Sequence, residues 1–90
     1  MKPTIKIAVA EDNHRALQLI ETKLSRFPDL ELALTAENGR VLIQKLENYT
    51  ELIDLILMDI QMPVMDGIEL CRQIKTNIEW SHIPVILLTA

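Results

Sequence analysis

The sequence predicts an α/β fold built on a parallel sheet, and three observations support this prediction. Short apolar runs alternate with longer segments whose apolar residues recur at helical spacing, which is typical of strands joined by helical crossovers. The composition is 49% hydrophobic but only 3% aromatic, so the core must be aliphatic. Aliphatic strands suit a parallel sheet, which is covered on both faces. The length of 90 residues is enough for one small domain.

The sequence of the first half of the chain predicts two strands and two helices. Residues 5–9 are a β-branched, apolar run and form the first predicted strand. Asn13 can cap a helix over residues 14–27, whose apolar residues lie close to one face. Residues 30–36 alternate strictly between apolar and other residues, which predicts a half-buried strand at a sheet edge. Helical spacing returns over residues 41–48.

The second half predicts two more strands around a third helix. Residues 55–58 are continuously apolar, residues 68–78 have helical spacing, and residues 85–89 form a fourth strand after a proline. This last strand is apolar on both faces, and no helix follows it in these ninety residues. An uncovered apolar edge strand is an aggregation hazard. We therefore expect residues 1–90 to be a single domain that is truncated at its C-terminus.

The composition also excludes several classes of protein. The net charge is −4, and no cluster of five lysines and arginines occurs, so this segment is not expected to contact nucleic acid directly. The single cysteine, Cys71, excludes an internal disulfide and is compatible with a reducing cytoplasm, where we expect the protein to be located. No apolar stretch approaches the ~20 residues of a membrane helix, so no membrane association is expected.

Acidic residues follow two of the predicted strands. Glu11 and Asp12 end the first strand, Asp59 ends the third, and Thr89 ends the fourth. Because the carboxyl ends of parallel strands meet at one edge, these side chains are expected to converge there. Three carboxylates repel one another unless a cation joins them, and Mg²⁺ is a suitable hard cation. An aspartate oxygen can attack phosphorus, and the Thr89 hydroxyl can donate to phosphoryl oxygens.

Other polar or reactive residues have structural interpretations. Asp66 is expected to be a helix cap or a solvated acid, and Gly67 to provide a backbone conformation that other residues resist. His14 and His82 have no metal-ligand partner at suitable spacing and are expected at the surface. Cys71 lies on the apolar face of the third predicted helix and is expected in the core.

Four separated motifs together resemble the receiver domain of two-component response regulators. They are the acidic pair Glu11-Asp12, Asp59 after the third strand, the Met-Pro-Val-Met-Asp-Gly loop at residues 62–67, and Thr89-Ala90 after the fourth strand. The resemblance implies a flavodoxin-like three-layer sheet of order 2-1-3-4-5 with the site at its switch point. This sequence contains only the first four strands and three helices of that fold.

The resemblance also implies roles for these residues. Asp59 would be the phosphoacceptor, receiving a phosphoryl group from a sensor histidine kinase or a phosphotransfer protein. Glu11, Asp12 and Asp59 would bind Mg²⁺, together with the backbone carbonyl of Gln61. Thr89 would be the switch hydroxyl that follows the phosphoryl group. The domain would be a phosphoacceptor signalling domain and not an enzyme, in a longer chain with an effector domain that is often DNA-binding.

One departure from the family bears on activity. Receivers continue with a helix, a fifth strand that carries an essential lysine, and a last helix, and none of these is in the sequence. Efficient phosphorylation by these ninety residues is therefore in question, and self-association through the fourth strand is expected. One alternative is a phosphorylation-independent interaction module. Another is an aspartyl-nucleophile phosphohydrolase, although Gln61 stands where such enzymes usually carry a second acid.

Overall fold

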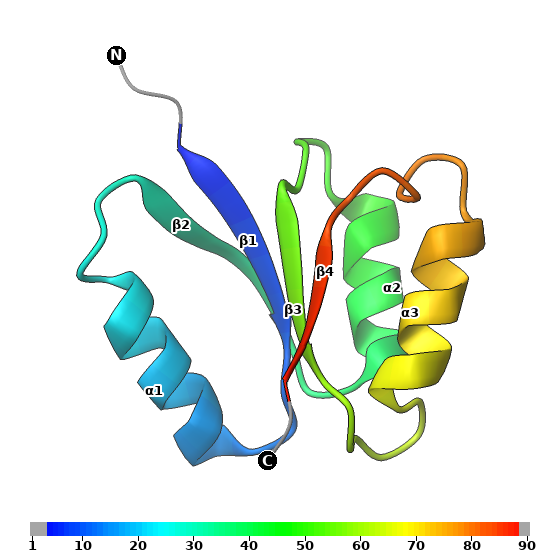
Figure 1. Cartoon of the computed structure of the whole chain (residues 1–90), viewed down its shortest axis with the longest axis horizontal. Coiled ribbons are helices and arrows are strands. Elements are labelled where there is room, and N and C mark those ends of the chain that lie inside the picture. The colour runs from blue at the N-terminus through cyan, green and yellow to red at the C-terminus, as the bar shows by residue number, and fades with distance from the viewer. Residues whose placement is uncertain (1–3, 89–90) are drawn as a thin grey trace.

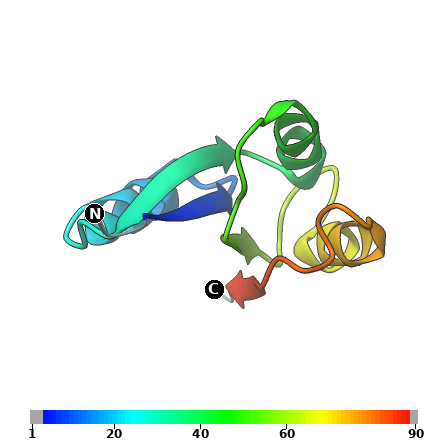
Figure 2. The same ribbon diagram turned by 90° about the horizontal axis from the view of Figure 1, so that it is seen from above.

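A computed structural model describes residues 4–88 and contains one four-stranded parallel sheet between two layers of helices (Figure 1). The elements in chain order are β1 (Ile5–Ala10), α1 (His14–Leu24), β2 (Leu30–Ala36), α2 (Gly39–Asn48), β3 (Leu55–Asp59), α3 (Gly67–Thr76) and β4 (Val85–Leu88). α1 lies on one face of the sheet, and α2 and α3 lie on the other (Figures 1 and 2). This confirms the predicted α/β fold.

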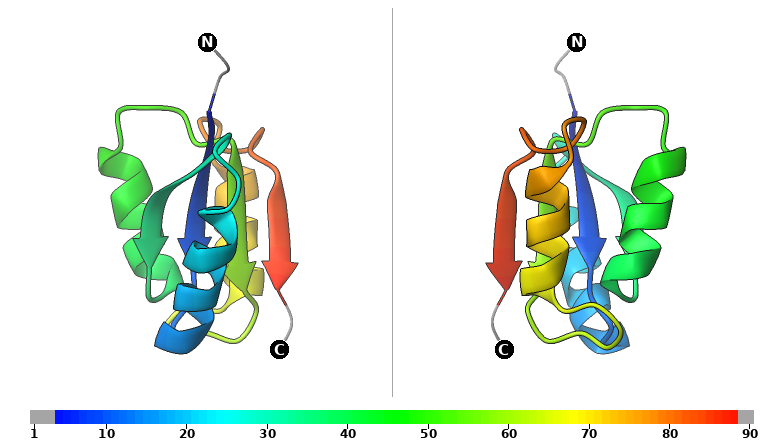
Figure 3. Two further views of the ribbon diagram at one scale, coloured as in Figure 1. Left: turned by 90° about the vertical axis from the view of Figure 1, so that its left-hand side faces the viewer. Right: turned by 90° about the vertical axis from the view of Figure 1, so that its right-hand side faces the viewer.

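The strand order is β2-β1-β3-β4, and all neighbouring strands are parallel. The registers align the carboxyl ends of the strands: Ala10 pairs with Ala36 and Met58, and Asp59 pairs with Leu88. Figure 3 shows the four strands pointing the same way. The predicted edge position of β2 is confirmed, and the connections that follow β1, β2 and β3 all leave the sheet at one edge.

The core lies between the sheet and the layer formed by α2 and α3. Four elements, β1, β3, α2 and α3, contribute apolar side chains that are at most 6% exposed: Ala8, Ala10, Ile56, Met58, Leu42, Leu46, Leu70 and Ile74. Cys71, which was expected in the core, is half-buried and packs against it. By contrast, none of the eleven residues of α1 is buried. The α2 and α3 layer is therefore the better packed side of the domain.

Each helix begins with a cap at the site edge of the sheet. Asn13, Asn38 and Asp66 accept a hydrogen bond from the backbone N–H three residues later, at 3.0, 2.9 and 2.9 Å. Such caps satisfy N–H groups that have no partner within the helix. The predicted caps at Asn13 and Asp66 are confirmed, and the caps fix the direction in which each helix leaves the sheet.

Two predicted helix ends are wrong. α1 ends at Leu24, and Phe27, which was expected on its buried face, is 56% exposed. A proline disfavours helical backbone at the residue before it, so Pro28 acts on Phe27 and the chain tightens into a turn instead. α3 ends at Thr76, and Ile78 is 92% exposed beyond it. There Asn77 is extended and its side chain accepts the N–H of Glu79, which starts a turn.

No helix in residues 4–88 is long and apolar enough to cross a membrane.

Candidate functional site

Three carboxylates converge at the carboxyl edge of the sheet. Glu11 and Asp12 directly follow β1, and Asp59 is the last residue of β3, the strand that pairs with β1. Each offers a carboxylate oxygen, and these oxygens lie within 4.8 Å of one another. The predicted convergence of these three residues is confirmed.

Glu11 is the most constrained of the three acids. It is 7% exposed, and its backbone N–H donates to the Ala36 carbonyl at 2.9 Å, which ties the end of β1 to β2. Burial raises the pKa of the Glu11 carboxyl from its ordinary 4.5 to about 7, and the neighbouring Asp59 and Asp12 carboxyls act in the same direction. The Asn13 N–H, which donates to Glu11 Oε2 at 3.3 Å, lowers this pKa. A cation beside these carboxylates would favour their charged forms.

Asp59 is half-buried and partly held by the loop that follows it. The backbone N–H of Gln61 donates to Asp59 Oδ1 at 3.0 Å. This bond turns one carboxylate oxygen toward the loop and leaves Oδ2 for other partners. It also places the Gln61 backbone beside the acids, while metal ligation by the Gln61 carbonyl stays a prediction.

The loop from Ile60 to Asp66 is tightly folded against the end of β3. The Gly67 N–H donates to the Ile60 carbonyl at 2.9 Å. A Cβ at Gly67 would lie 2.5 Å from the Asp59 carbonyl oxygen and 2.8 Å from Ile60 Cα. The expectation that Gly67 provides an unusual backbone conformation is wrong, because its φ is not positive. The glycine is needed because two backbone segments approach closely.

An unusual backbone conformation in this loop belongs to Val64 instead. Its φ is 70°, and the Met65 N–H donates across it to the Pro63 carbonyl at 2.7 Å. This three-residue turn with a positive central φ is rare and strained for a β-branched residue. Such strain is common at functional sites, where the surrounding structure maintains it.

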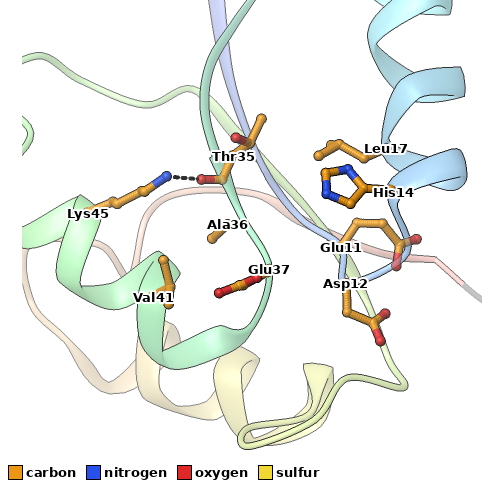
Figure 4. A pocket seen from close by; sticks show the side chains of 9 residues that line it. All are labelled: Glu11, Asp12, His14, Leu17, Thr35, Ala36, Glu37, Val41 and Lys45. Carbon is orange, nitrogen blue, oxygen red and sulfur yellow. Dashed lines mark hydrogen bonds between the residues drawn. The ribbon is translucent and has the colours of Figure 1, made fainter.

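A pocket of about 260 Å³ lies beside the acids, between the connections that follow β1 and β2 (Figure 4). His14 and Leu17 from α1 face Val41 and Lys45 from α2 across it. Glu37, directly after β2, also lines this pocket, and sequence reasoning missed it. The signal was present in the sequence, because Glu37 follows β2 as Glu11 follows β1.

The remaining predicted site residues have different outcomes. His14 and His82 are exposed, as expected. Thr89, the expected switch hydroxyl, lies outside the described residues. Its position relative to Asp59 therefore stays a prediction.

Known proteins share both the sequence pattern and the fold. Residues 7–90 match the family model described as the response regulator receiver domain. The chain is 39% identical to a protein-glutamate methylesterase/protein-glutamine glutaminase from Nocardioides sp. over 94% of this chain and 22% of that protein. It is 33% identical to the response regulator PleD from Caulobacter vibrioides over 94% of this chain and 18% of that protein.

A solved structure agrees with these relatives. The phosphorylated cyanobacterial phytochrome response regulator RcpA superposes with a TM-score of 0.87 and 28% identity, over 96% of this chain and 65% of that chain. The chain thus spans less than a quarter of the two relatives above and about two thirds of this solved chain. With the predicted flavodoxin-like fold confirmed, this chain belongs to the receiver domains of response regulators, the phosphoacceptor domains of two-component signalling.

Proposed function

We propose that Asp59 is the residue of this receiver domain that accepts the phosphoryl group. The observation that carries the proposal is the position of Asp59 at the end of β3, with Glu11 and Asp12 oxygens within 4.8 Å. Its Oδ1 accepts the Gln61 N–H, so Oδ2 is the oxygen that attacks phosphorus. A bond forms between Oδ2 and phosphorus, and the bond from phosphorus to the donor nitrogen breaks.

We further propose that Glu11, Asp12 and Asp59 hold a Mg²⁺ ion, with the Gln61 carbonyl as a fourth protein ligand. The donor set fits this hard cation, because it consists of oxygens and leaves positions for water and phosphoryl oxygens. The raised pKa of Glu11 points the same way, since three clustered carboxylates are poorly compensated without a cation. The ion would neutralise charge on the acids and on the incoming phosphoryl group.

The proposed partners follow from the family. The phosphoryl donor is a phosphohistidine of a sensor kinase or a phosphotransfer protein in the cytoplasm, and Thr89 is the switch hydroxyl. We place residues 1–90 as a single receiver-like domain in a longer protein with an effector domain, because the methylesterase and PleD relatives are several times longer than the matched region. The new aspartyl phosphate carries about −1.5 to −2 charges where the aspartate carried −1, and it adds three acceptor oxygens. This charge would bias an existing equilibrium of the site loops.

The proposal is tested by incubating the longer parent protein, which supplies the rest of the receiver fold, with Mg²⁺ and acetyl phosphate and measuring its intact mass. We expect one phosphoryl adduct on the wild type and none on Asp59→Asn, which keeps the size of the side chain but lacks a nucleophilic carboxylate. Asp54→Asn is the matched control, because Asp54 precedes β3 at the opposite edge of the sheet and should leave the adduct unchanged.

Two results would contradict the proposal. One is the absence of an adduct on the wild type, and the other is an equal adduct on Asp59→Asn. Metal binding is measured separately, by following backbone amides during a Mg²⁺ titration. We expect the changes to centre on Glu11, Asp12 and Asp59, and changes elsewhere would reject the proposed ligands.

A further inference from the structure

A second pocket, called the hollow below, lies at the amino edge of the sheet, away from the proposed phosphorylation site. Its volume is about 200 Å³, and it lies between the connection from α2 to β3 and the connection from α3 to β4. Figure 1 shows both connections at the edge where the strands begin. The acids of the phosphoryl site lie at the other edge, so this hollow is a separate feature.

The hollow is negatively charged. Glu47, Glu51 and Glu79 line it together with one histidine, His82, and no lysine or arginine among residues 4–88 does. Glu51 is paired with the Lys6 ammonium. Within the described part of the chain, the side chains of Glu47 and Glu79 have no ion pair or hydrogen bond. Two uncompensated carboxylates therefore border the hollow.

Two of the three aromatic side chains of the protein line the hollow. Tyr49 and Trp80 line it, and Phe27 is the only other aromatic residue in the sequence. Both lining residues are half-buried and pack against the core, which fixes their position. Aromatic faces attract cations, and the planar guanidinium of arginine stacks on them while its N–H groups bond to carboxylates.

Two exposed aliphatic side chains lie at the hollow and beside it. Leu52, which lines it, is 75% exposed. An adjoining hollow between α2 and α3 shares Glu47, Glu79 and Trp80 and is also lined by Ile78, which is 92% exposed. Exposed apolar side chains beside uncompensated charge are typical of a protein interaction site.

From these observations we propose that the hollow binds an arginine side chain on a segment of a partner protein, with aliphatic neighbours of that arginine packing on Leu52 and Ile78. The volume is below the ~300 Å³ of a usual small-molecule pocket, so one side chain fits better than a nucleotide or cofactor. The carboxylates select a cation, and the aromatic residues favour a guanidinium. The surface is formed by elements remote from Asp59, so binding does not require phosphorylation.

The probe is the peptide acetyl-Ala-Leu-Arg-Leu-Ala-amide, titrated into the ¹⁵N-labelled full chain with Mg²⁺ present and followed by NMR. We expect saturable shifts of the Trp80 indole N–H and of amides in residues 49–53 and 79–83. The same peptide with citrulline in place of arginine keeps the shape but lacks the charge, and we expect its binding to be at least tenfold weaker. Increasing salt should weaken binding of the arginine peptide.

Two double variants provide a charge-matched comparison. Glu47→Gln with Glu79→Gln should weaken peptide binding roughly two- to thirtyfold, the range for two exposed charge pairs. Glu21→Gln with Asp29→Asn removes the same charge from exposed positions elsewhere and should leave binding unchanged. The proposal is overturned by equal binding of the citrulline peptide, by shifts centred on Glu11, Asp12 and Asp59, or by no shift at millimolar peptide.

Discussion

At the scale of single residues, the loop after Asp59 is shaped by backbone constraints more than by side-chain contacts. The Gly67 N–H bonds to the Ile60 carbonyl, and Val64 adopts a φ of 70° at the centre of a tight turn. Val64 is 69% exposed, so its burial does not compensate for this strain. The loop conformation therefore depends on the anchor at Gly67, which also determines where the Asp59 backbone lies.

We predict that Gly67→Ala destabilises the protein by about 3 kcal/mol and weakens Mg²⁺ binding. The new Cβ would lie 2.5 Å from the Asp59 carbonyl oxygen, so the backbone of the proposed phosphoacceptor must move. Urea unfolding measures the first effect, and an NMR titration with Mg²⁺ measures the second. If the Gly67→Ala variant had the same stability and the same Mg²⁺ affinity as the wild type, the close approach at Gly67 would not be important.

Gly39→Ala is the matched control for this prediction. A Cβ at Gly39 would also be crowded, at 2.9 Å from Met65 Sδ, but its neighbour is a flexible side chain. Alanine also favours the helix that begins at Gly39. The loss of stability should therefore be clearly smaller than at Gly67, and the Mg²⁺ affinity should be unchanged.

At the scale of elements, Lys6 joins three segments at the amino edge of the sheet. From β1 its ammonium pairs with Glu31 on β2 at 3.4 Å and with Glu51 in the connection before β3. Tyr49 donates its hydroxyl to Glu51 at 3.2 Å, and the Lys6 backbone N–H donates to Asp54. These contacts hold the connection after α2 against β1, on which the register of β3 depends.

We predict that Glu51→Gln lowers stability at neutral pH and that the difference from the wild type decreases in acid. The Lys6 ammonium holds the pKa of the Glu51 carboxyl below its usual range. A carboxylate with a lowered folded pKa stabilises the protein above its unfolded pKa, about 4.3, and loses this contribution as the pH falls through the folded value. The Glu51 carboxylate in turn raises the pKa of Lys6, so the Lys6 contribution is lost only in strong base.

Urea unfolding of both proteins at a series of pH values checks this prediction. Glu21→Gln is a suitable control, because Glu21 is exposed and has no ion pair among residues 4–88. The difference in unfolding free energy between Glu21→Gln and the wild type should be smaller than that of Glu51→Gln at neutral pH, because no ion pair of the described residues is removed. A difference in unfolding free energy between Glu51→Gln and the wild type that stays constant from pH 3 to pH 8 would contradict the proposed role of the ion pair.

The elements were predictable from sequence where burial determines the pattern. The continuous apolar run of β3 and the helical spacing of α2 identify these elements, and the acids at strand ends predicted that three carboxylates converge at one edge. Helix ends at Phe27 and Ile78 were wrong because apolar periodicity continues past the point where local turn hydrogen bonds take over. The strain at Val64 was not predictable, since nothing in a valine indicates a positive φ.

At the scale of the whole molecule, the two faces of the sheet are unequally covered. α2 and α3 bury side chains in the core, whereas α1 buries none. β4 lies at the edge and pairs only with β3 among the described strands. Its central residues, Ile86 and Leu87, are 48% and 37% exposed and point to opposite faces. β4 therefore presents both unpaired backbone groups and apolar side chains.

We predict that this chain self-associates through β4, because an exposed apolar edge strand is a template for pairing with another chain. Light scattering over a concentration series should show the apparent mass rising above 10.3 kDa. Ile86→Lys should reduce this rise, since a lysine on an edge strand opposes strand pairing. Leu19→Lys makes the same kind of change at a 61% exposed position on α1 and should leave association unchanged. A monomeric mass for the wild type at every concentration would reject the prediction, and an equal effect of both variants would place the association surface elsewhere.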